Sequence, residues 1–141
     1  CQKSILFDKL YKHFDGNLKG KTIALWGLAF KPGTDDMREA PSLVLIERLK
    51  AAGCNVRAFD PVAIGEAKRR IGDSIYYAND IYDALHEADA LMLVTEWKEF
   101  RMPNWSIIRK AMNHPVIIDG RNIFDSHDLT EQGFAYYCIG R

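Results

Sequence analysis

Apolar and polar positions follow two alternating patterns along most of this chain. Short apolar runs recur from residue 22 onward, and they lack the in–out alternation of strands that face water on one side. Segments with helical spacing separate them. The apolar runs predict strands at residues 22–26, 55–59, 75–77, 90–94, 116–118 and 135–139.

The segments between these runs predict helices at residues 42–52, 64–71, 80–88, 105–112 and 129–132. Pro41 stands at a favourable first-turn position, and Gly53 follows the end of the same helix. Asp80 is placed to cap the third of them. Strands that alternate with helices form parallel pairs through right-handed crossovers. We therefore expect an α/β fold: a doubly wound, mainly parallel, Rossmann-like sheet of about six strands flanked by helices.

One further helix is predicted at residues 2–14, before the first strand. Leu6, Leu10 and Phe14 recur every four residues, and Gly16 is suited to end the helix. A helix in this position has no place inside a strand–helix repeat. We expect it to link to a preceding part of the protein or to pack on a partner, and the start at Cys1 rather than Met indicates a piece of a longer chain.

Composition narrows the function classes. The 141 residues carry 19 basic and 19 acidic side chains, so no net charge attracts nucleic acid or an anionic membrane. No apolar run approaches the roughly 18 residues that a membrane span needs. Three cysteines without a CxxC pair argue against disulfides and zinc and favour reduced thiols in the cytoplasm. No Ser/His/Asp or Cys/His set predicts a nucleophile, so no catalytic residue and no metal site are assigned.

In doubly wound sheets, ligands bind beyond the carboxyl ends of the strands. Residues 27–39 follow the first strand, without the GxGxxG fingerprint of dinucleotide sites. Free N–H groups at the start of the helix near Pro41, together with Lys31 and Arg38, favour an anion there. The alternative is a solvated loop in which Arg38 pairs with Asp35 or Asp36, and loop composition leaves the two about equal.

The other strand ends carry weaker signals. Asp60 follows the second strand, where an acidic residue could hold a ribose hydroxyl, but capping of the next turn is favoured. Trp97 and Phe100 share a helical face and are interpreted as core rather than as an aromatic wall, and Glu96 alone is weak evidence for catalysis. Arg121 is placed to bind a phosphate or sugar, or to pair with Asp119 or Asp125.

The run of residues 20–39 resembles the opening of the UDP-binding C-terminal domain of UDP-glucose 6-dehydrogenases, in the UDP-glucose/GDP-mannose dehydrogenase family. Stretches 59–61, 95–97, 119–122 and 139–141 resemble the family in the same order. The resemblance implies that Phe30 and Lys31 contact the substrate, that Arg121 binds the nucleotide sugar, and that Arg38 reaches the NAD pyrophosphate. It favours the anion site over the solvated loop.

The resemblance also implies a division of the chain and of the reaction. Residues 1–17 correspond to the end of a central dimerisation region, and residues 18–141 to the UDP-sugar-binding domain of a homodimeric enzyme. Members oxidise UDP-glucose to UDP-glucuronate with two NAD and a catalytic cysteine from an upstream Gly-rich stretch. Neither that stretch nor the NAD fingerprint occurs in these 141 residues. We therefore expect the isolated chain to lack dehydrogenase turnover.

Two alternatives remain open at this level. One is the same domain of a GDP-mannose or UDP-N-acetylmannosamine dehydrogenase. The other is a non-enzymatic, receiver-like module in which Asp60 and Asp119 hold Mg²⁺. Lys31, Arg38 and Arg121 at the same strand ends favour an anion over a cation.

Overall fold

Six parallel strands form one sheet in the computed structural model, which describes residues 2–38 and 40–139. The strands are β1 (Thr22–Trp26), β2 (Asn55–Phe59), β3 (Tyr76–Tyr77), β4 (Ala90–Leu93), β5 (Val116–Asp119) and β6 (Ala135–Cys138). Their order is β3-β2-β1-β4-β5-β6, and every neighbouring pair is parallel. This confirms the predicted doubly wound sheet. Glu39, Gly140 and Arg141, which belong to the stretches quoted above, lie outside the described residues, as does Cys1.

The helices are α1 (Gln2–His13), α2 (Pro41–Ala51), α3 (Ile64–Ile71), α4 (Trp105–Ala111) and α5 (Ser126–Glu131), with two 3₁₀ turns, η1 (Asp83–Leu85) and η2 (Lys98–Phe100). None of these helices is long and apolar enough to cross a membrane. The prediction of a helix at residues 80–88 is wrong, because only the short turn η1 forms there. Asp80 does cap the turn, since its carboxylate accepts from the N–H groups of Tyr82 and Asp83. Glu87 then adopts a left-handed conformation, φ 55°, which ends the turn.

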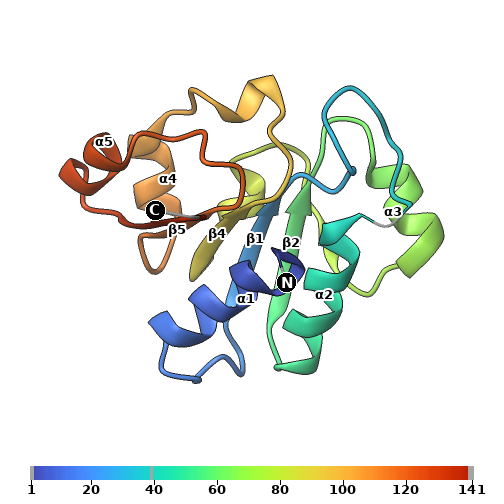
Figure 1. Ribbon diagram of the computed structural model, residues 1–141, viewed down its shortest axis with the longest axis horizontal. Helices are drawn as coiled ribbons and strands as arrows, with labels where there is room; N and C mark the ends of the chain where they lie inside the picture. Colours follow the sequence, from blue (N-terminus) through green and yellow to red (C-terminus); the bar gives the residue numbers. More distant parts are fainter. Residues whose placement is uncertain (1, 39, 140–141) are drawn as a thin grey trace.

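Both faces of the sheet are covered, which explains why the central strands β1 and β4 are buried along almost their whole length. In β1, Ile23 and Leu25 enter the core under α1, α2 and α3, whereas Ala24 and Trp26 enter the core on the opposite face, under η1, α4 and α5. Figure 1 shows α1 and α2 in front of the sheet.

Helix α1 packs on this same domain. Leu6, Phe7 and Leu10 are buried in the core that α2 also covers. At its C-terminal end, His13 Nδ1 lies 2.5 Å from the hydroxyl of Tyr137 in β6. The predicted helix is therefore confirmed, and its apolar stripe is covered by the sheet rather than left for another protein. The predicted boundary at residue 17 stays a prediction.

The strand order brings four loops to one edge of the sheet, which we call the carboxyl edge. The loops after β2, β1, β4 and β5 stand there as neighbours in that order. Figure 1 shows the β1–α2 loop (cyan) and the β4–α4 loop (gold) beyond the arrowheads of β1 and β2. Only β4 separates the strands that lead to Lys31 and Arg121, a span of about 10 Å at the usual strand spacing.

Candidate functional site

The β1–α2 and β4–α4 loops touch at a glycine. Gly27 has φ +104°, and a Cβ atom on it would lie 2.5 Å from the backbone nitrogen of Thr95. Thr95 in turn donates its hydroxyl to the carbonyl of Ala29, at 2.7 Å. Only a residue without a side chain permits this approach, so the loop that carries Lys31 is held against the loop after β4.

Asp60 ties three loops together. It is 2% exposed. Its Oδ2 atom accepts from the backbone N–H groups of Leu28 and Ala29 and from the indole of Trp97, at 2.8, 3.1 and 3.0 Å. Its Oδ1 atom accepts from two N–H groups at the start of the next turn, at 2.8 and 2.7 Å. The capping interpretation is confirmed, and both oxygens are taken by protein donors rather than presented to a ribose.

Phe30 and Lys31 are both exposed on the β1–α2 loop. The loop closes through a bond from the N–H of Phe30 to the carbonyl of Asp36, at 2.8 Å. Phe30 is 51% exposed although it is aromatic. Among the described residues, no acidic side chain pairs with Lys31. An apolar ring and an unpaired cation therefore stand next to each other at the carboxyl edge.

Arg38 belongs to the same loop but is paired. Its Nε and Nη2 atoms donate to the two carboxylate oxygens of Asp36, at 3.1 and 3.0 Å, and its backbone N–H donates to Oδ1. These bonds from Arg38 lower the pKa of Asp36 to about 2. The pairing that composition allowed is thus present. The Arg38 side chain is also 80% exposed, so an anion that approached it would compete with Asp36 for the guanidinium.

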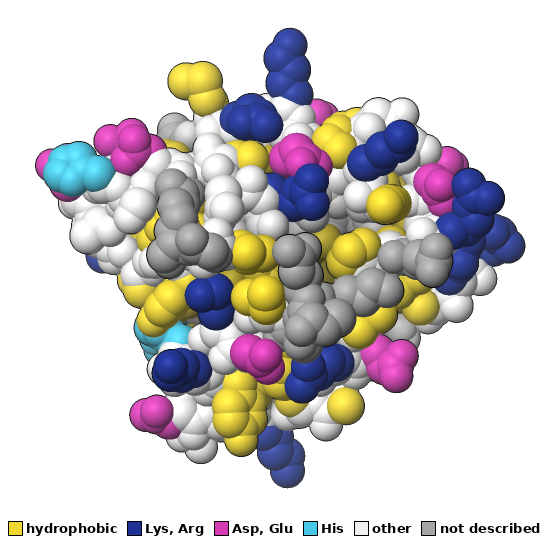
Figure 2. All heavy atoms as spheres, viewed as in Figure 1, with side chains coloured by type: hydrophobic (Ala, Val, Ile, Leu, Met, Phe, Trp, Pro, Cys, Tyr) yellow, Lys and Arg dark blue, Asp and Glu magenta, His cyan; other side chains and the backbone are white. Residues whose placement is uncertain are grey.

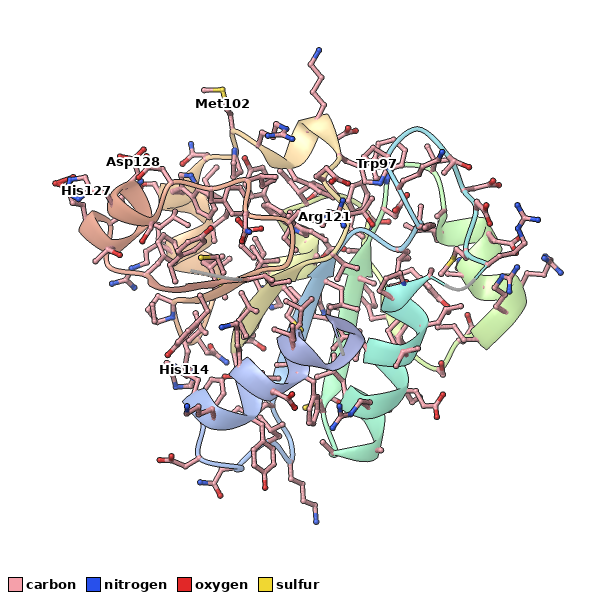
Figure 3. The ribbon with its side chains drawn as sticks, viewed as in Figure 1. Trp97, Met102, His114, Arg121, His127 and Asp128 are labelled. Atoms are coloured by element: carbon pink, nitrogen blue, oxygen red, sulfur yellow. The ribbon has the colours of Figure 1, made fainter. Side chains whose placement is uncertain are left out.

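Arg121 enters the carboxyl edge from the β5–α5 loop, and its partner is Glu96. The Nε and Nη2 atoms of Arg121 lie 2.8 and 2.6 Å from the same oxygen, Glu96 Oε2. Its side chain pairs with neither Asp119 nor Asp125. Asp125 caps α5, and Asp119 bonds to the backbone N–H of Arg121 but not to its guanidinium. Figure 3 shows Arg121 beyond the strand ends and Trp97 beside the β1–α2 loop.

The backbone around Arg121 is held by buried bonds. Asp119, fully buried, accepts from the N–H groups of Arg121 and Phe124 and from the hydroxyl of Tyr136. The N–H of Gly120 donates to the carbonyl of Leu93 on β4. Asn122 is left-handed, φ 57°, and its amide exchanges two bonds with the backbone of residue 139. The β5–α5 loop is therefore a fixed base for the Arg121 side chain.

The structure does not bring the two proposed Mg²⁺ ligands together. Asp60 and Asp119 end strands that lie three positions apart in the sheet, about 14 Å at the usual spacing. The carboxylate oxygens of each residue accept hydrogen bonds from protein donors. Across the part of the chain that the structure describes, no group of three or more His, Cys, Asp or Glu side chains is arranged to hold a metal ion.

One hollow lies at the other edge of the sheet, where the strands begin. A cavity of about 520 Å³ is lined by Thr22, Asn55 and Tyr76, which begin their strands, and by Cys54 and Arg57 among others. Burial raises the pKa of the Cys54 thiol to about 11, so the thiolate is scarce at neutral pH. This position is opposite to the carboxyl edge, where the predicted site residues lie.

Sequence reasoning missed the part that the β4–α4 loop plays. Trp97 and Phe100 are buried, as predicted for core residues, but Trp97 also donates to Asp60. Glu96, treated as an isolated carboxylate, is the partner of Arg121. Figure 2 shows Lys and Arg side chains interspersed with Asp and Glu side chains on the α1–α2 face. In the part of the chain that is described, no patch of one charge sign on that face therefore marks a binding site. These contacts depend on the sheet order, which places β4 between β1 and β5 and is not visible in the local sequence.

The family model and the curated relatives point to one family. A model of the UDP-glucose/GDP-mannose dehydrogenase family, UDP binding domain, matches residues 24–126. A UDP-glucose 6-dehydrogenase of Pseudomonas aeruginosa is 50% identical over 145 residues, which cover 99% of this chain and 32% of that protein.

Solved structures give the same result. A UDP-glucose dehydrogenase from the archaeon Pyrobaculum islandicum superposes with a TM-score of 0.80 at 26% identity, over 96% of this chain and 29% of that one. A UDP-D-ManNAc dehydrogenase from Pyrococcus horikoshii gives 0.72 at 31% identity, over 99% of this chain and 30% of that one. The chain thus spans about a third of the length of the relatives that it matches.

Proposed function

Since this chain belongs to the UDP-glucose/GDP-mannose dehydrogenase family, as its UDP-binding domain, we propose that its carboxyl edge holds UDP-glucose through Phe30, Lys31 and Arg121. The observation that carries this proposal is the convergence of loops. The strand order and the bonds of Thr95 and Glu96 link the loop of Phe30 and Lys31 to the loop of Arg121.

The three side chains offer complementary chemistry. The Lys31 ammonium is a compact positive charge suited to a phosphate oxygen. The Arg121 guanidinium donates in a planar fork that matches phosphate or a pair of sugar hydroxyls. Phe30 gives an exposed apolar face against which a ring can pack. These residues bind and orient a nucleotide sugar, and none of them performs chemistry on it.

The residues present do not form a dinucleotide site of the usual kind. The β1–α2 loop lacks the glycine fingerprint, and Asp60, at the ribose position, is buried with five protein donors. Arg38 is the residue that we propose for contact with the NAD pyrophosphate, because its guanidinium is exposed on the same loop. NAD would supply the hydride acceptor and would be bound mainly by the rest of the protein.

We further propose that the whole protein is a cytoplasmic homodimer that oxidises UDP-glucose to UDP-glucuronate with two NAD. The name of the Pseudomonas aeruginosa relative, and the identity to it, support the oxidation of UDP-glucose. The two NAD, the homodimer and the cytoplasm are proposed from the family resemblance in the sequence. The nucleophilic cysteine implied by the family resemblance has no counterpart here: among the described residues, Cys54 and Cys138 are buried. The 141 residues alone should therefore bind the nucleotide sugar without turning it over.

Melting temperature tests the binding proposal. A ligand that binds only the folded state raises the melting temperature. We expect millimolar UDP and UDP-glucose to raise it by several degrees, at about 2–8 °C per kcal/mol for a domain near this size. Lys31→Ala and Arg121→Ala should each weaken UDP binding by about tenfold or more, because a charge-assisted bond contributes about 1.5–3 kcal/mol.

Lys110→Ala, which removes the same charge from an exposed position on α4, is the matched control and should respond to UDP like the original chain. GDP in place of UDP tests the GDP-mannose alternative. A shift caused by Mg²⁺ and not by UDP would contradict the proposed function.

A further inference from the structure

Three consecutive residues of the β4–α4 loop each bind a different neighbouring loop. Thr95 donates to the carbonyl of Ala29 in the β1–α2 loop. Glu96 accepts from Arg121 in the β5–α5 loop. Trp97 donates to Asp60, which follows β2. Because β4 lies between β1 and β5 in the sheet, this segment is the physical connection between the loops that carry Lys31 and Arg121.

The contact between Glu96 and Arg121 uses only one edge of the guanidinium. Both Nε and Nη2 donate to the single oxygen Oε2, which occupies the side edge of the planar group. Within residues 2–38 and 40–139, no bond to Nη1 is present. The terminal edge, formed by Nη1 and the second N–H of Nη2, is therefore open for a bidentate ligand such as a phosphate.

The pair is poorly suited to stabilising the fold, which points to another role. The Arg121 side chain is 48% exposed, and exposed ion pairs contribute little to the free energy of unfolding. Without Glu96, a long arginine side chain on a rigid backbone would sample many rotamers, and binding would have to restrict them. Ordering such a side chain costs about 0.5–1.5 kcal/mol at an interface.

We propose that Glu96 is a positioning residue: it holds the Arg121 guanidinium by its side edge so that the terminal edge is presented to the diphosphate or sugar of the nucleotide sugar. This inference rests on the proposed function. It predicts that removal of Glu96 weakens UDP binding, whereas simple electrostatics predicts the opposite. A carboxylate beside an anion site should repel the ligand, so its removal would tighten binding if charge alone mattered.

The test is a titration of the 141-residue chain with UDP, read by NMR from backbone amides and from the Arg121 Nε–H signal. We expect Glu96→Ala to weaken UDP binding by about two- to tenfold, the cost of ordering one side chain. Glu96→Gln, which keeps an acceptor oxygen, should restore most of the affinity. The Nε–H signal of Arg121 should shift and broaden in Glu96→Ala before any ligand is added.

A double-mutant cycle separates positioning from general stability. In an Arg121→Ala background, the Glu96→Ala change should leave UDP affinity unaltered, because no guanidinium remains to be held. Glu99→Ala removes the same charge from an exposed position on η2 and should leave UDP binding and the Arg121 signal unchanged.

Equal or tighter UDP binding by Glu96→Ala, with weaker binding by Arg121→Ala, would overturn the positioning role and leave the proposed function intact. Arg121→Ala that binds UDP as well as the original chain would instead contradict the proposed function, and with it this inference.

Discussion

Asp60→Ala is expected to lower the free energy of unfolding by about 4 kcal/mol or more, which is among the largest effects of a single substitution. The carboxylate is buried and accepts five N–H donors from three loops. Alanine would leave all five without a partner, at about 1–3 kcal/mol for each group that water does not reach. Urea denaturation measures the effect directly.

Asp80→Ala is the matched control. Asp80 also accepts two backbone N–H groups at the start of a turn, but it is exposed, so its loss should cost about 1 kcal/mol. Asp60→Asn keeps the shape and one acceptor oxygen and should fall between the two alanine variants. If the free energy of unfolding of Asp60→Ala lay within about 1 kcal/mol of that of the original chain, Asp60 would not be the residue that holds the three loops together.

Gly27→Ala is expected to cost about 3 kcal/mol or more in unfolding free energy. The added Cβ would lie 2.5 Å from the backbone and side chain of Thr95, and the backbone has φ +104°. Overpacking and backbone strain add in this position, because the atoms that would have to move belong to a neighbouring loop. The same substitution should also weaken UDP binding, since it pushes apart the loops of Lys31 and Arg121.

Gly33→Ala separates strain from the clash. Gly33 has φ +84°, but a Cβ atom there meets no neighbour within 4 Å. Its cost should be limited to the left-handed conformation, about 1–2 kcal/mol. The two variants are compared by their urea midpoints. Equal losses of stability would mean that the clash with Thr95 contributes nothing to the cost of Gly27→Ala.

The fold could be predicted from the sequence because the local and the global signals agree. Strand β1 is apolar at every position that a two-sided sheet buries, and α2 has Pro41 at its start and Gly53 beyond its end. The prediction failed at residues 80–88, where Asp80 signals a helix start. The chain there must instead turn into β4, and the left-handed Glu87 leaves room only for η1.

The candidate site was only partly predictable. Arg121 has two acidic neighbours along the chain, Asp119 and Asp125, and nothing local favours Glu96, which is 25 residues away. That partner follows from the position of β4 beside β5. Three of the five donors of Asp60, on Leu28, Ala29 and Trp97, likewise come from segments that meet it only after folding. Phe30 and Lys31 could be named because they belong to one contiguous stretch of residues.

The most direct measurement is a map of UDP contacts by ¹H–¹⁵N chemical shifts on the 141-residue chain. If cationic side chains of the β1–α2 and β5–α5 loops hold the diphosphate, the large shifts will fall in residues 27–38, 95–97 and 119–122. Shifts centred on the cavity lined by Thr22, Arg57 and Tyr76, at the opposite edge, would contradict this assignment, as would saturating UDP that leaves Lys31 and Arg121 unperturbed.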